Sequence, residues 1–140
     1  ECGSSVGGAM EKVVVAGHGG TISVTADKSV VYKLAGSDNA LSVIVKSAAD
    51  APLSGLCFIL SGNQTKLDVT VESEVQKLYF SGSGNMSQGA IHVTKGGAIS
   101  QGLVVRMSGN NSSLVLDGEG AFSCPTPDLR GRGSKVECVR

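Results

Sequence analysis

Val13-Val14-Val15-Ala16-Gly17 is an apolar run that ends in a small residue and a glycine, and the chain repeats this pattern. The further copies are Tyr32-Lys33-Leu34-Ala35-Gly36, Phe58-Ile59-Leu60-Ser61-Gly62, Leu78-Tyr79-Phe80-Ser81-Gly82 and Val105-Arg106-Met107-Ser108-Gly109. A polar corner follows each glycine. An alternating segment then begins five residues after the glycine in four copies and nine residues after it in the fourth. Recurrence at about 20 to 50 residues is typical of repeat architectures.

The segments that follow the corners alternate between apolar and polar residues. In Lys66-Leu67-Asp68-Val69-Thr70-Val71-Glu72 the odd positions are apolar, which is the period of a strand with one buried face. Units of strand, corner and strand predict an all-β fold, a short β-solenoid of about five repeats with parallel stacking and disulfide-held ends. The alternative is an antiparallel β-sandwich or jelly roll in which each repeat is a hairpin.

The composition favours the solenoid over the sandwich. The chain has 140 residues, of which 20 are glycine and none is tryptophan. A sandwich usually centres on large aromatic side chains, whereas stacked coils are filled by layers of Val, Ile and Leu. We expect a single domain over 1–140, with an N-terminal lead or cap at 1–11 and five β repeats at 12–123. The strand pattern disappears in 124–140, which predicts a disulfide-closed tail rather than a sixth repeat.

Charge and hydropathy argue against two classes of partner. Twelve basic and 12 acidic side chains give a net charge of zero, whereas a nucleic-acid binder carries a basic patch. The longest apolar runs are about five residues, against roughly 20 needed to span a bilayer. We therefore expect no nucleic-acid partner and no membrane insertion.

The four cysteines are Cys2, Cys57, Cys124 and Cys138, an even set without the Cys-x-x-Cys spacing of a zinc ribbon. Three pairings are open to them, and the most economical joins Cys124 to Cys138 and Cys2 to Cys57. Each disulfide would contribute about 2–4 kcal/mol of stability and would imply an oxidising compartment. The competing interpretation is a set of free, buried thiols in a cytosolic protein.

Four of the five asparagines open an Asn-x-Ser/Thr sequon, namely Asn63, Asn85, Asn110 and Asn111. All four lie in the corners, where a bulky sugar would not collide with the core. Turn chemistry is an equal alternative, because Asn and Ser side chains bond nearby backbone groups and Asn tolerates positive φ. Asn110 and Asn111 overlap, so at most one of them is expected to be modified.

Candidate catalytic residues are few. If the coils align at their first apolar residues, Ser23, Ser42, Asp68 and His92 form one outward column. The order does not suit a hydrolase, because the histidine must contact both the serine and the carboxylate, and a flat face has no oxyanion hole. His18 and His92 are isolated, which argues against a metal site. We expect a protein that is not an enzyme and that needs no metal or cofactor.

These observations predict a secreted, N-glycosylated structural subunit of an extracellular or cell-surface assembly. Open strand edges at the ends of a solenoid can pair with a second copy, and a head-to-tail contact that does not close builds a filament. The segments expected to mediate this contact are Val13, Val14 and Val15, together with the tail. The alternative is an adhesin or carbohydrate-binding module that recognises glycans or cell-surface proteins. A polysaccharide-active enzyme is a distant third.

Overall fold

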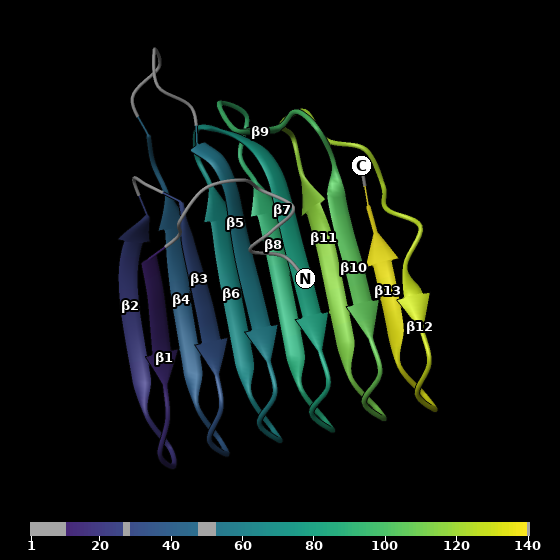
Figure 1. The fold of residues 1–140 in the computed structure, drawn as a ribbon. Coiled ribbons are helices and arrows are strands. Elements are labelled where there is room, and N and C mark those ends of the chain that lie inside the picture. Colours follow the sequence, from purple (N-terminus) through teal and green to yellow (C-terminus); the bar gives the residue numbers. More distant parts are fainter. Residues whose placement is uncertain (1–10, 27–28, 48–52, 140) are drawn as a thin grey trace.

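The computed structural model describes residues 11–26, 29–47 and 53–139, and the strands in these ranges form a β-solenoid (Figure 1). Two sheets face each other, and the chain passes from one to the other and back as it advances along the axis. Every pair of neighbouring strands in them is parallel. The predicted all-β solenoid is therefore confirmed, and the hairpins of the antiparallel alternative do not form in this part of the chain.

With the exception of one short strand, the strands alternate between the two sheets in chain order. In spatial order, the first sheet contains β1 (Glu11–Val15), β3 (Val30–Leu34), β5 (Leu53–Leu60), β7 (Glu74–Gly82), β10 (Leu103–Met107) and β12 (Asp128–Leu129), with β9 (Ala98–Ile99) beside the start of β7. The second sheet contains β2 (Thr21–Ala26), β4 (Ala40–Val45), β6 (Lys66–Val71), β8 (Gln88–Val93), β11 (Ser113–Gly118) and β13 (Lys135–Cys138). We number the coils 1 to 6 by their second-sheet strands, so that β1 and β2 form coil 1 and β12 and β13 form coil 6.

Equivalent residues of successive coils stack into columns inside the solenoid. Val43, Val69 and Ile91 lie opposite one another on β4, β6 and β8, and all three are fully buried. On the first sheet the rings of Tyr32 and Phe58 stack with their centroids 5.5 Å apart. The alternation seen in the sequence thus supplies one apolar layer per strand, and burial of these layers is the main stabilising term.

A column of corner glycines allows the coils to stack closely. Each of them lies against the carbonyl oxygen of the corner glycine in the coil before it, and an added Cβ would overlap that oxygen. The residues are Gly36, Gly62, Gly84, Gly109 and Gly131, which follow Gly17 in coil 1. The corners are aligned along the lower edge of Figure 1. Only glycine permits this approach of one backbone to another.

Coil 4 departs from the predicted repeat. The sequence pattern places its corner glycine at Gly82, but Gly84 makes the corner contact and Gly82 lies in the core opposite Leu60. Gly89 likewise replaces the leucine of neighbouring coils, since it pairs with Leu67. The ring of Phe80 fills the space, and a Cβ on Gly89 would lie 3.0 Å from Phe80 Cε2. One large ring therefore compensates for two missing side chains.

The C-terminal tail also departs from the prediction, because it forms a short sixth coil. β12 extends the first sheet from Arg106 and Met107, and β13 extends the second sheet from β11. Gly131 makes the same corner contact as the glycines before it. The tail lacks an alternating pattern of its own, and its strands are held by ladder bonds to coil 5.

The predicted disulfide between Cys124 and Cys138 is confirmed, with the two Cα atoms 5.8 Å apart. It joins the segment that leads into coil 6 to the end of β13. Cys57 is also disulfide-bonded and is fully buried, although it lies on the outward side of β5, between the inward-facing Leu56 and Phe58. Cys2, the partner predicted for Cys57, lies outside the described residues.

The corner glycines provide a direct test of coil stacking. We expect Gly62→Ala to lower the free energy of unfolding by about 3 kcal/mol, because its Cβ would overlap the carbonyl oxygen of Gly36. Gly96→Ala is the matched control, since its Cβ would meet only the Glu72 carbonyl oxygen, at 3.6 Å. Urea denaturation followed by circular dichroism measures both. Equal stability of the two variants would contradict this account of the corner.

Candidate functional site

The outward face of the second sheet presents columns of side chains that run along the solenoid axis. Their members, from coil 1 onward, are Thr21, Ala40, Lys66, Gln88, Ser113 and Lys135 in the first column, Ser23, Ser42, Asp68, Ala90, Val115 and Glu137 in the second, and Thr25, Ile44, Thr70, His92 and Asp117 in the third. Most of these side chains are small or polar, so this face is flat.

The predicted column of Ser23, Ser42, Asp68 and His92 is correct for its first three members and wrong for His92. Because Gly89 rather than Ile91 pairs with Leu67, Ala90 follows Asp68 and His92 moves to the third column. The first inward position of β8 is a glycine, so a search for the first apolar residue places the start of this strand two residues too late.

His92 has a carboxylate neighbour that the sequence did not indicate. Its Nδ1 lies 2.8 Å from Asp117 Oδ1 on the next strand, and Thr70 stands opposite it on the other side. The column thus reads hydroxyl, imidazole, carboxylate. His92 is 53% exposed, however, and the backbone N–H groups beneath it are engaged in the sheet, so no oxyanion hole is formed. This geometry supports an exposed polar pair rather than a nucleophilic site.

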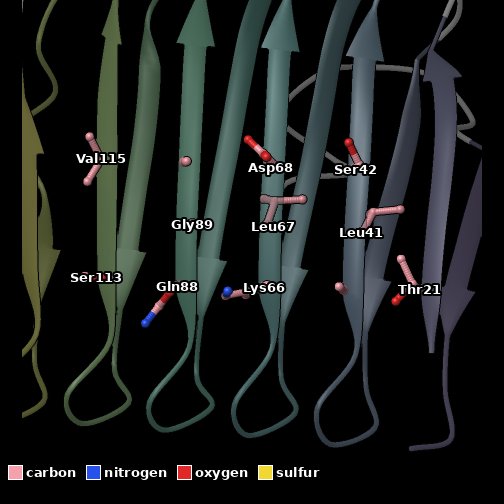
Figure 2. Close-up of a pocket in the computed structure, with 12 residues that line it drawn as sticks. Thr21, Leu41, Ser42, Lys66, Leu67, Asp68, Gln88, Gly89, Ser113 and Val115 are labelled. Atoms are coloured by element: carbon pink, nitrogen blue, oxygen red, sulfur yellow. The ribbon is translucent and has the colours of Figure 1, made fainter. Parts of the chain in front are cut away.

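A shallow trough of about 400 Å³ crosses this face between the first and second columns (Figure 2). It extends over β2, β4, β6, β8 and β11, and therefore runs parallel to the solenoid axis. Figure 2 shows Ser42 and Asp68 projecting at one level, with Thr21, Lys66 and Gln88 nearer the corners. The trough offers hydroxyl, amide, ammonium and carboxylate groups in a row, without an aromatic ring.

The sequon asparagines Asn63, Asn85 and Asn110 occupy one exposed column at the corners. Each side-chain oxygen accepts the backbone N–H of the next coil at 2.8–3.0 Å, the last bond being to Arg132. The chain thereby forms an asparagine ladder on its surface. Asn111 lies outside this ladder and has a φ of +56°. The turn chemistry that competed with glycosylation is therefore present, and the side-chain nitrogens of the three ladder asparagines take no part in it.

The hydroxyls of the same sequons lie inside the corner. Thr65, Ser87 and Ser112 are 1–2% exposed. Ser87 Oγ donates to Gly62 O at 3.3 Å and accepts the N–H of Thr65 at 3.3 Å, so it bridges two groups of the preceding coil. Ser112 makes the equivalent bonds to Gly84 O and to the N–H of Ser87, both at 3.1 Å. The sequon hydroxyls are therefore structural in the folded chain.

Sequence reasoning missed this buried ladder, although a signal was present. A polar residue occurs three positions after each corner glycine of coils 2 to 6, at Asn39, Thr65, Ser87, Ser112 and Ser134. Asn39 makes the same contacts with an amide, since its Oδ1 accepts the N–H of Gly20 and its Nδ2 donates to Gly17 O. In coil 4 the pattern appears only when Gly84, rather than Gly82, is taken as the corner glycine.

The N-terminal end of the solenoid carries the outermost described strand of each sheet. Among the described residues, β1 and β2 each pair with a strand on one side only. On β1, Val14 is 50% exposed, whereas Val15 is buried in the core. On β2, the inward-facing Ile22 is 37% exposed, although its partner Leu41 is 1% exposed. The predicted assembly segment Val13 to Val15 therefore forms an end strand of the first sheet.

The C-terminal end is built differently. β12 has only two residues and follows Pro125 and Pro127, and β13 places the charged Lys135 and Glu137 on its outward side. Asp128 pairs with Arg130 at 3.2 Å. Short strands, prolines and charges are the devices with which proteins blunt a sheet edge. Of the two ends, the N-terminal one offers the longer strand edges.

The part of the chain that the structure describes comprises residues 11–26, 29–47 and 53–139. No group of three or more His, Cys, Asp or Glu side chains lies there close enough to hold a metal ion. The same residues contain no helix that is long and apolar enough to cross a membrane.

The buried hydroxyl ladder gives a prediction about stability. Ser112→Ala removes the acceptor for the N–H of Ser87 and the donor to Gly84 O, so we expect a loss of about 1–3 kcal/mol. Ser113→Ala, one residue further along the chain, is the control, because the Ser113 hydroxyl points outward from β11. Thermal and urea unfolding of the two unglycosylated variants will separate them. A Ser112→Ala variant as stable as the control would contradict a structural role for the hydroxyl.

The chain was also compared with known proteins. No protein-family model, curated protein or solved structure gives a significant match. The functional inferences below therefore rest on the geometry of the described residues.

Proposed function

We propose that this protein is a secreted, N-glycosylated structural subunit that assembles with copies of itself by strand addition at its N-terminal coil. The observation that carries the proposal is the edge of coil 1, which has no further strand beside it among the described residues and where the inward-facing Ile22 remains 37% exposed. Such an edge presents unpaired backbone groups next to uncovered apolar side chains, and a parallel or antiparallel strand of a second copy can satisfy both.

The chemistry of this edge suits a second copy. The outward side chains of β2 are Thr21, Ser23 and Thr25, so two copies can approach without bringing like charges together. On β1 the outward side chains are those of Lys12 and Val14. In an antiparallel pairing of two β1 strands centred on Val13, Lys12 of one copy lies opposite Val14 of the other, so the two lysines do not face each other. The zero net charge also limits long-range repulsion between subunits.

The direction of assembly follows from the unequal ends. Head-to-tail addition, as the sequence predicts, would lay β12 and β13 on the next copy's β1 and β2 and would build a filament. The two-residue β12 offers little backbone to such a contact. Pairing of two N-terminal ends would instead use the five residues of β1 and the six of β2 from both copies. It would give a closed pair of subunits as the unit of the assembly.

The secretory part of the proposal is supported by two features. The disulfide between Cys124 and Cys138 is of the kind that persists in oxidising compartments. The sequon asparagines Asn63, Asn85 and Asn110 stand exposed at the corners, away from both sheet faces, so sugars there would leave the flat faces and the open edge uncovered.

Charge at the open edge tests the assembly. We expect the unmodified protein to self-associate in sedimentation velocity experiments and Ile22→Lys to weaken this association at least about tenfold, because a charge on an edge strand blocks strand addition. Val104→Lys is the control, since Val104 is 43% exposed but lies on β10 in coil 5, far from the N-terminal edge. Electron microscopy of the unmodified protein distinguishes filaments from closed pairs. A chain that stays monomeric at high concentration would overturn the proposal.

The trough favours a second candidate function, a binding module for a linear polysaccharide. It runs across five strands, and its polar groups recur at the spacing of neighbouring strands, about 4.8 Å. An extended chain with hydroxyls on both sides could lie along it and exchange hydrogen bonds with Ser42, Asp68 and Gln88. The described residues of the trough provide no ring for stacking, which makes this the weaker candidate.

Filling the trough tests this second candidate. Ala90→Arg would place a long side chain over the hollow between Asp68 and Val115, so we expect it to reduce binding to a glycan array about tenfold or more. Val104→Arg, on the outward face of the first sheet, is the control. Absence of binding by the unmodified protein to every polysaccharide tested would argue against the module.

A further inference from the structure

The three sequons of the asparagine ladder are split between surface and interior. The asparagines are exposed, and their side-chain oxygens accept backbone N–H groups while their side-chain nitrogens make no ladder bond. The hydroxyl residues two positions later, Thr65, Ser87 and Ser112, are 1–2% exposed. One half of each sequon is therefore accessible in the folded chain and the other half is not.

A sequon is defined by its hydroxyl as much as by its asparagine, so an enzyme that recognises it must reach both. In the solenoid the hydroxyl of Ser87 is engaged by Gly62 O and by the N–H of Thr65, and that of Ser112 by Gly84 O and the N–H of Ser87. Presenting these hydroxyls to an enzyme requires the corner to separate from the preceding coil.

The middle residues of the sequons strengthen this constraint. Gln64 and Met86 have φ values of +57° and +55°, a left-handed conformation that is uncommon for such residues. Their N–H groups donate to Asn85 O and Asn110 O of the next coil, both at 2.9 Å. The sequon is thus folded into a tight corner that is fixed from both neighbouring coils, and it cannot extend while both contacts remain.

We propose that Asn63, Asn85 and Asn110 are open to N-glycosylation only before their coils stack, and that the finished solenoid is closed to it. This inference rests on the secretory route proposed above. Stacking of a coil on the one before it encloses the hydroxyls of Ser87 and Ser112. The hydroxyl of Thr65 is engaged when the following coil is added, because it donates to Ser87 Oγ at 2.9 Å.

The reaction itself is compatible with the ladder. Asparagine Nδ2 attacks C1 of a sugar carried on a lipid pyrophosphate, the C1–O bond breaks, the lipid pyrophosphate leaves, and one amide proton passes to a base of the enzyme. The new bond is made by nitrogen, so Oδ1 keeps its lone pairs for the N–H of the next coil. A glycosylated chain can therefore still form the bonds that Asn63 and Asn85 make to the following corners.

Asn111 provides an internal contrast. The hydroxyl of its sequon belongs to Ser113, which lies on the outward side of β11 and is half-buried rather than enclosed in the corner. Asn111 itself is exposed. Its backbone, however, is held like that of Gln64 and Met86, with a φ of +56° and its N–H bonded to Arg132 O at 2.8 Å. Asn111 therefore separates the two constraints, because its corner is fixed while its sequon hydroxyl is accessible.

The test compares folded and unfolded substrates of one enzyme. The full disulfide-bonded chain, made in a bacterial periplasm, is incubated with a purified oligosaccharyltransferase and its lipid-linked donor. Synthetic peptides covering 60–68, 82–90 and 107–115 are treated in the same way. We expect the peptides to be modified and Asn63, Asn85 and Asn110 of the folded chain to react at least about tenfold more slowly, since reaction must wait for local opening. Site-resolved mass spectrometry gives each rate.

A corner variant makes the comparison sharper. Gly84→Ala leaves every sequon intact but forces coil 4 away from Gly62 O, so we expect faster modification of Asn63 and Asn85, whereas the control Gly96→Ala should behave as the unmodified chain. Equal rates for peptides and folded chain at the three asparagines would overturn the proposal. Even if Gly84→Ala fails to fold, the comparison of folded chain with peptides decides the matter.

A separate measurement keeps this inference apart from the proposed function. The chain is expressed with a signal peptide in a eukaryotic secretory cell, and occupancy is mapped on the secreted product. Occupied ladder sequons on correctly folded protein support both ideas, because the sugars must then have been added before stacking. A secreted chain without sugars would contradict the proposal that the protein is a glycoprotein. The rates measured on the purified folded chain and the peptides would still test whether the folded corner blocks modification.

Discussion

The contact of one backbone with another at the corner glycines is the constraint on which the rest of the structure depends. Each corner glycine lies so close to the carbonyl oxygen of the corner glycine in the preceding coil that no side chain fits between them. Examples are Gly36, Gly62 and Gly84. That approach fixes the height of each coil, and with it the register of the strands on both sheets. The polar ladders follow from the same geometry, because they connect groups that only this spacing brings within hydrogen-bonding range.

Three kinds of surface result from this plan, and they differ in what they can do. The flat face of the second sheet is polar and shallow, the corners are crossed by hydrogen bonds, and the ends expose strand edges. Among the described residues, the N-terminal end combines strand edges that have no neighbouring strand with uncovered apolar side chains such as Ile22, which supports assembly better than binding to a face. His92 and Asp117 form an exposed polar pair on a flat surface, outside the kind of concave pocket in which ligands usually bind.

The fold could be predicted from sequence because its two controlling patterns are local. Glycine-terminated apolar runs recur, and alternation marks the buried face, as in Lys66 to Val71. The misplaced glycine of coil 4 could not be resolved in this way. Gly82 and Gly84 both follow the apolar run, and which one makes the corner depends on the ring of Phe80 in the core. The register error at His92 follows from that same coil, where Gly89 replaces a leucine.

The candidate site was less predictable than the fold. The corner location of the sequons could be inferred, whereas the burial of Ser87 and Ser112 depends on contacts between residues 22 to 28 positions apart. The tail was misjudged for a related reason. β12 and β13 have little strand pattern of their own and exist because coil 5 offers a template, although Gly131 and Ser134 repeat the corner residues.

The disulfide between Cys124 and Cys138 also determines how the molecule would respond to tension. A pull on the C-terminus passes through Cys138 directly to Cys124, so residues 125–137 carry no load. Force instead reaches the end of coil 5, which would have to peel from coil 4. A released coil such as the 22 residues from Gly62 to Gly84 would lengthen the chain by about 70–80 Å. Covalent closure of the last coil would thus protect β12 and β13 from fraying under tension.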